Sequence, residues 1–170
     1  MSENNSIEIP NMPDSNCFAC GPINGKGLGM KFFKNDSIVY CNISIPAYMA
    51  GWNSVVHGGI LSTLLDETMG WGAIVLLKKY IFTKSMTVNY HKPVLVMDTL
   101  RVESEVKERI NEREAVMTAR VYNSKSELCV SSTGVFSLME KDYITKLAIV
   151  EEKQINFFSE LFESFEKEQK

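Results

Sequence analysis

The chain has 170 residues, of which 45% are hydrophobic and 23% charged, as in an ordinary globular domain with enough chain for one core. Its 18 basic and 21 acidic residues give a net charge of −3, which argues against a surface for nucleic acid or for an anionic membrane. Residues 1–16 are polar, contain Pro10 and Pro13, and show no apolar signal-peptide segment, so we expect a loosely ordered arm on a cytoplasmic protein.

Two of the four cysteines, Cys17 and Cys20, have the CxxC spacing that serves zinc or redox chemistry in other proteins. The chain has no second CxxC, and no histidine close in sequence completes a tetrahedral zinc set. We therefore interpret the pair as small buried thiols in a turn, and we expect no metal and no cofactor. Metal binding and redox chemistry are the alternatives.

Two short strands are predicted next, at residues 28–33 and 38–45, because apolar and polar residues alternate there. Pro46 ends the second strand. The loop of residues 47–56 carries Tyr48, Met49 and Trp52, more apolar surface than a passive loop needs. Either this loop packs under the domain, or it is a lid over an acyl-binding cleft.

Residues 60–77 are apolar or small almost throughout, which predicts a buried helix that runs to about Lys79. The run is about long enough to cross a membrane, but its glycines and its two central carboxylates, Asp66 and Glu67, favour a core helix. A buried charge is costly unless it is paired, hydrated or functional. Successive helical residues point about 100° apart, so the two carboxylates face different partners. One of them is a candidate for a functional site.

The turn His57-Gly58-Gly59 leads into this helix. Backbone N–H groups at a helix start are unpaired, and glycines let a ligand oxygen approach them closely. Such a corner suits a carbonyl oxygen that gains negative charge during acyl transfer. Asp66 lies roughly 13 Å further along the helix, too far to act on the same carbonyl. Two antiparallel copies in a dimer would bring both groups together, which predicts a site shared between subunits.

Beyond the helix, four segments alternate with period two, at about residues 85–91, 100–107, 115–121 and 128–139. They predict a four-strand antiparallel meander with one apolar face. A final amphipathic helix at residues 151–168 has an apolar stripe that consists of Ile155, Phe158, Phe162 and Phe165. We expect it to pack on this domain or on a neighbouring subunit.

The predicted fold class is therefore α+β, with one antiparallel β-sheet wrapped around one long buried helix and an extra C-terminal helix. We divide the chain into a flexible arm at residues 1–16, a domain at residues 17–140, and a C-terminal helical extension at residues 141–170.

This order of elements and the run HGGILSTLLDETMG at residues 57–70 resemble the hotdog-fold acyl-CoA thioesterases of the PaaI-like branch. The opening CFACG at residues 17–21, followed by KGL at residues 26–28, is similar to the thioesterase superfamily member 4 subgroup. The resemblance covers about residues 17–140. It implies the hotdog fold and hydrolysis of acyl-CoA to a free acid and coenzyme A without a cofactor. It also implies a homodimer or homotetramer with the active site at the subunit interface.

The resemblance also implies roles for the matching positions. Asp66 would be the general base or the nucleophile, and the backbone N–H of Gly58 would polarise the thioester carbonyl. His57 would shape the turn, and Thr83 would help to position water. Some relatives use an asparagine before this turn, near Gly51 of this chain. The further candidates for substrate contacts are Gly59, Asn53, Trp52 and Glu67.

Each of these residues also has a plain structural interpretation. Asp66 would then be a paired core carboxylate, Glu67 a structural or solvent-facing one, and His57 a partner of the loop. Two other functions stay open. One is a hotdog hydratase or dehydratase that acts on acyl thioesters with a histidine and a carboxylate. The other is a non-catalytic protein that binds acyl-CoA and keeps the fold.

Overall fold

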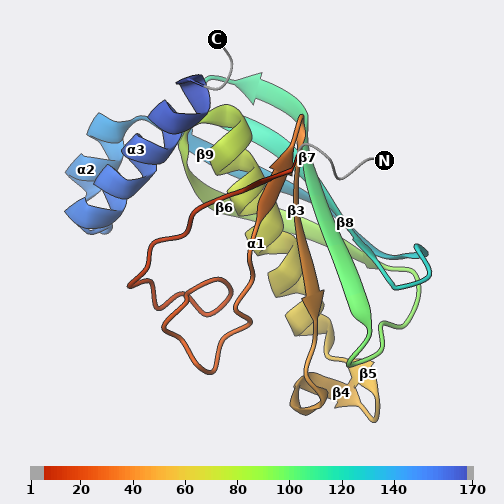
Figure 1. Ribbon diagram of the computed structural model, residues 1–170. Helices are drawn as coiled ribbons and strands as arrows, with labels where there is room; N and C mark the ends of the chain where they lie inside the picture. Colours follow the sequence, from red (N-terminus) through yellow and green to blue (C-terminus); the bar gives the residue numbers. More distant parts are fainter. Residues whose placement is uncertain (1–5, 168–170) are drawn as a thin grey trace.

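Helix α1 (Gly58–Leu77) is the centre of the fold in the computed structural model, which describes residues 6–167. Leu64, Leu65 and Met69 are fully buried, as expected for a helix that is apolar on all sides. By length and composition α1 is apolar enough to cross a membrane, but the sheet covers it and it forms the core of the domain (Figure 1). The prediction of one long buried helix is confirmed.

One seven-stranded antiparallel sheet packs against α1, in the strand order β1-β2-β3-β7-β8-β9-β6. The strands are β1 (Ile7–Glu8), β2 (Phe33–Asn35), β3 (Ile38–Ser44), β6 (Tyr80–Tyr90), β7 (Thr99–Asn111), β8 (Glu114–Tyr122) and β9 (Leu128–Met139). Along β8, buried residues alternate with partly exposed ones, because one face of the sheet lies on the helix. The predicted α+β class, with a sheet wrapped around a helix, is confirmed.

The predicted four-strand meander is wrong in one strand. Strands β7, β8 and β9 are consecutive neighbours, but β6 pairs with β9 and β7 pairs with β3. The alternation of apolar and polar residues shows which face of a strand is buried, and it does not show which strand lies beside it. The chain therefore leaves α1 at one edge of the sheet and crosses to the middle of the sheet for β7.

Two segments before the helix differ in detail from the prediction. Strand β2 begins only at Phe33, while Met30 and Phe32 are buried in a loop that crosses the core. The loop before α1 contains a short 3-10 helix, η2 (Ala47–Met49), and a small hairpin. The hairpin strands are β4 (Ala50–Trp52) and β5 (Val55–Val56), and they lie near the start of α1 (Figure 1).

Part of the predicted N-terminal arm is packed on the domain. Ile7 and Glu8 pair with β2, and Ile9 is buried in the core. The burial of Ile9 is one reason, because an apolar side chain is stabilised when it is removed from water. Residues 1–5 of the arm lie outside the described residues.

Two helices follow the sheet, α2 (Lys141–Leu147), which the sequence analysis missed, and α3 (Glu152–Lys167). Figure 1 shows them side by side beyond the end of α1. Helix α3 packs on its own domain, because the Tyr80 hydroxyl donates to the Ile155 carbonyl at 2.7 Å and the Phe158 ring lies 5.9 Å from Trp71. Its expected packing role is therefore confirmed, while the division of the chain into a domain and an extension stays a prediction.

Candidate active site

Asp66 and Thr83 are brought together by α1 and β6. The Thr83 hydroxyl donates a hydrogen bond to Asp66 Oδ1 at 2.9 Å. Asp66 is half-buried and Thr83 is exposed, so the carboxylate is held by the protein and still open to solvent. A carboxylate that is oriented in this way and reaches water can accept a proton from it. The structure thus places two of the predicted catalytic residues in direct contact.

His57 caps the start of α1. Its ring Nδ1 accepts a hydrogen bond from the Gly59 N–H at 2.9 Å, and its backbone N–H donates to the Met49 carbonyl at 3.1 Å. This cap leaves Gly58 as the first residue of the helix, and among residues 6–167 its N–H has no recorded acceptor. An unpaired N–H at the positive end of a helix is a donor for an oxyanion. The amides of Gly58 and Gly59 therefore differ, and the Gly58 amide is the one that remains available.

Tyr90 and Ser62 also hold this turn, which the sequence analysis did not find. The Tyr90 hydroxyl donates to the Gly58 carbonyl at 2.9 Å and lies 2.8 Å from the Ser62 hydroxyl. The Ser62 hydroxyl also donates to the Gly58 carbonyl at 3.1 Å. Tyr90 is 32 positions from Gly58, at the far end of β6, so it reaches this turn only because α1 packs against β6.

The hairpin before α1 carries two predicted substrate contacts. Trp52 is 84% exposed, and Asn53 occupies the hairpin turn with a φ of 43°. Gly51 packs on His57, because a Cβ there would lie 3.2 Å from His57 Cα. The described contacts join neither Trp52 nor Asn53 to Asp66 within one chain.

Glu67 faces away from the Asp66–Thr83 pair. Its Oε1 accepts hydrogen bonds from the Trp71 indole at 3.1 Å and from the Cys17 thiol at 3.8 Å. Burial raises the pKa of Glu67 to about 7. The structure therefore places this predicted substrate contact against the N-terminal loop rather than beside Thr83.

Two cavities of the described chain lie away from the catalytic candidates. Asp66 lies eight positions after Gly58 on the helix, which corresponds to about 12 Å. One cavity of about 1050 Å³ lies between α2 and the ends of β8 and β9, and another of about 330 Å³ lies at the end of α1. Neither is lined by Asp66, Thr83 or Gly58.

Comparisons with known proteins bear on the same segment. Residues 53–130 match the family model of the thioesterase superfamily. The chain is 27% identical over 108 residues to the acyl-coenzyme A thioesterase THEM4 of Xenopus laevis, which covers 63% of this chain and 48% of that protein. The chain spans about half the length of the curated relatives it matches.

Solved structures show the same architecture. The PaaI protein of E. coli, from the phenylacetic acid degradation operon, has a TM-score of 0.60 and 17% identity, over 66% of this chain and 81% of that one. A hypothetical thioesterase protein from Streptococcus pneumoniae TIGR4, solved with coenzyme A, has a TM-score of 0.60 and 22% identity, over 65% and 85% of the two chains. These likenesses confirm the fold. The chain is therefore similar to the thioesterase superfamily over residues 53–130, and the protein has the hotdog fold.

Proposed function

We propose that the protein is an acyl-CoA thioesterase, which hydrolyses the thioester to a free acid and coenzyme A. The observation that carries the proposal is the Asp66 carboxylate, oriented by the Thr83 hydroxyl and open to water. The names of the curated relatives and the coenzyme A in the Streptococcus pneumoniae structure support the same substrate class.

In the proposed reaction, Asp66 takes a proton from water, and the resulting hydroxide attacks the thioester carbonyl. The carbon–oxygen bond forms, the negative charge moves to the carbonyl oxygen, and the Gly58 N–H stabilises that charge. When the carbonyl reforms, the carbon–sulfur bond breaks and the coenzyme A thiolate leaves. The thiolate then takes up the proton. Direct attack by Asp66 on the carbonyl is the variant of this mechanism that the resemblance leaves open.

We place the complete site between two copies of the chain. Strand β6 is 11 residues long and forms one edge of the sheet, so that within residues 6–167 one of its sides has no strand partner. An open edge of this length favours pairing with another copy. Two β6 strands in antiparallel pairing set the two α1 helices antiparallel, so that Gly58 of one copy approaches Asp66 of the other. The exposed Trp52 on the hairpin would then reach the partner's side of the site.

Release of free thiol from acyl-CoA, followed with a thiol-reactive dye, tests the proposal. The panel is acetyl-, hexanoyl-, palmitoyl-, phenylacetyl- and benzoyl-CoA, and the proteins are the wild type, Asp66→Asn and Glu67→Gln. We expect Asp66→Asn to lower kcat by at least about a hundredfold, because a positioned general base contributes roughly 10²–10⁴-fold. Glu67→Gln is the matched control, one residue away on the same helix, and should be much milder. Near-normal turnover by a folded Asp66→Asn variant would contradict the assignment of Asp66.

Two other functions give different results in related assays. A hydratase would change the enoyl absorbance of crotonyl-CoA, whereas a binding protein would bind acyl-CoA tightly and release no thiol. The cap on α1 occupies His57 Nδ1 with the Gly59 N–H, so a hydratase would have to use His57 Nε2 as its acid or base. The cytoplasmic location is part of this proposal, and cell fractionation tests it.

A further inference from the structure

A second cluster of reactive side chains lies where the N-terminal loop crosses α1. It consists of Cys17, Cys20 and Glu67, and we call it the cysteine–glutamate cluster. Two sulfurs and one carboxylate oxygen of these residues all lie within 4.8 Å of one another. The Cys17 thiol donates to Glu67 Oε1 at 3.8 Å across 50 positions of sequence. Because Glu67 is so far from the cysteines in sequence, the sequence analysis could not identify it as the third member.

The backbone around the two cysteines is tightly folded. The Gly21 N–H donates to the Cys17 carbonyl at 3.0 Å, and the Asn11 side chain donates to the Cys20 carbonyl at 2.6 Å. A Cβ at position 21 would lie 2.4 Å from the Cys17 nitrogen, so only glycine fits there. The turn thus fixes the backbone of both cysteines before any ligand arrives, which lowers the entropic cost of binding one.

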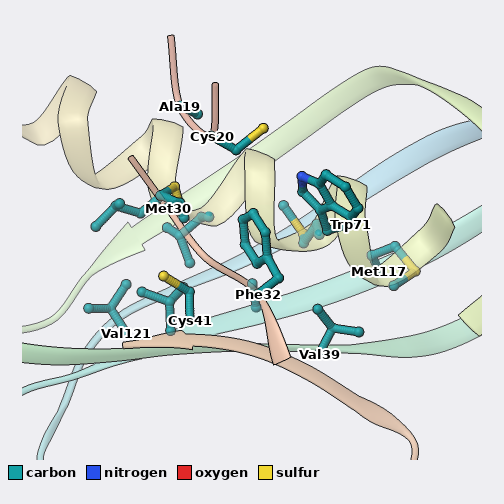
Figure 2. Close-up of a cluster of buried hydrophobic side chains, with 14 of the residues drawn as sticks. Ala19, Cys20, Met30, Phe32, Val39, Cys41, Trp71, Met117 and Val121 are labelled. Atoms are coloured by element: carbon teal, nitrogen blue, oxygen red, sulfur yellow. The ribbon is translucent and has the colours of Figure 1, made fainter. Parts of the chain in front are cut away.

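The carboxylate of the cluster is fixed as well. The Trp71 indole N–H donates to Glu67 Oε1 at 3.1 Å, and Trp71 itself is buried and stacked on Phe32 with ring centres 5.4 Å apart. Figure 2 shows Cys20 beside α1, on the same side as Trp71 and Phe32. A hydrogen bond from a buried neighbour is the usual device that orients a metal-binding carboxylate. Cys20 is buried, while Cys17 and Glu67 are half-buried and leave the cluster accessible from solvent.

We propose that Cys17, Cys20 and Glu67 bind a zinc ion, with a water as the fourth ligand. Zinc takes thiolate sulfur at about 2.3 Å and carboxylate oxygen at about 2.0–2.2 Å in a tetrahedron, which needs ligand atoms about as close together as these. Calcium and magnesium are excluded by the two sulfurs, because these ions prefer oxygen ligands. Binding displaces the thiol protons into solvent. The ion would tie the N-terminal loop to α1 at the residue next to Asp66.

Cobalt(II) and zinc titrations of the reduced, metal-free full chain test this site. We expect one Co²⁺ per chain with thiolate-to-metal charge-transfer absorption, and we expect Zn²⁺ to displace it, since zinc binds such sites more tightly. Cys17→Ser and Cys20→Ser should lose the absorption. Glu67→Gln should keep a weaker version of it, with an affinity lower by about tenfold or more. Cys129→Ser is the control, because Cys129 is buried outside the cluster and should leave binding unchanged.

Thermal unfolding supplies a second readout. Zn²⁺ should raise the Tm of the wild type and of Cys129→Ser, and a chelator should reverse the effect. Zn²⁺ should leave the Tm of Cys17→Ser unchanged. No charge-transfer absorption in the reduced wild type would overturn the proposal, and so would an equal cobalt affinity in wild type and Cys17→Ser. The wild-type result decides the matter even if a variant fails to fold.

Discussion

At the scale of single residues, the Asp66–Thr83 contact joins the helix to the edge strand. The Thr83 hydroxyl donates to one carboxylate oxygen at 2.9 Å. Hydrogen bonds to charged groups are worth about 1.5–3 kcal/mol each, so this one is strong enough to fix the carboxylate rotamer. Thr83 is thereby a positioning residue for the proposed base.

We expect Thr83→Val to lower kcat by about ten- to a hundredfold, which is the kinetic equivalent of losing that hydrogen bond. Thr83→Ser keeps the hydroxyl and should restore most of the activity. The measurement is thiol release at saturating substrate, with KM determined separately. If valine and serine had the same effect, the hydroxyl would have no positioning role.

Gly58 allows an equally specific change. It is the first residue of α1, and His57 before it is extended with φ −61° and ψ 133°. Proline fits the first helical position after an extended residue, so Gly58→Pro removes the N–H and keeps the helix. We predict a loss of about 10²–10³ in kcat, the usual cost of one oxyanion donor. Gly58→Ala retains the N–H and should be far more active; an equal loss in alanine would show that shape rather than the donor matters there.

Which of these contacts the sequence could predict depends on their distance along the chain. The turn His57-Gly58-Gly59 is local, so its geometry follows from glycine and from the cap. Asp66 stood out as a carboxylate on an apolar helix, while Thr83, 17 positions later, was found through the resemblance, and their contact needed the structure. The contact of Cys17 with Glu67 depends on the path of the N-terminal loop, which cannot be predicted from a periodic pattern of residues.

At the scale of elements, Gly72 allows α1 to pack closely against the sheet at Ser104 of β7. A Cβ on Gly72 would lie 2.4 Å from the Ser104 hydroxyl oxygen, which donates to the Thr68 carbonyl at 2.7 Å. A Cβ on Gly70 would meet only the end of Ile81 at 3.7 Å. Substitution of Gly70 and of Gly72 by alanine should therefore change the stability of the protein in opposite directions.

We expect Gly72→Ala to lower the free energy of unfolding by about 1–3 kcal/mol, the cost of an overpacked core. Gly70→Ala should leave it unchanged or raise it by up to about 1 kcal/mol, because alanine is the better helix former. Urea unfolding at fixed protein concentration measures both. A destabilisation of equal size in the two variants would contradict this packing.

The elements themselves were more predictable than their arrangement. The apolar run and the period-two segments gave α1, β3, β7, β8 and β9 within a few residues. The short elements β1, η2 and α2 and the β4–β5 hairpin were missed, because each is too short to show a period. The place of β6 at the sheet edge depends on a long crossover and not on its own residues.

At the scale of the whole molecule, one chain contains both parts of the proposed site, the start of α1 and the Asp66 carboxylate, but does not bring them together. The helix start and the carboxylate are about 12 Å apart on one helix. The edge strand β6 next to Asp66 has no neighbouring strand on one side in the part of the chain that the structure describes. Pairing of the β6 edges of two copies would give hydrogen-bond partners to their open backbone N–H and C=O groups. It would also complete two equal sites, as a two-fold interface requires.

The most direct test of this shared site is complementation. Asp66→Asn and Gly58→Pro chains, each inactive alone, are co-expressed with different tags, and the heterodimer is purified through both tags. If Asp66 of one chain acts with Gly58 of its partner, one site of the two is intact, and thiol release recovers to about half of the wild-type rate. A heterodimer no more active than its parents would contradict a shared site.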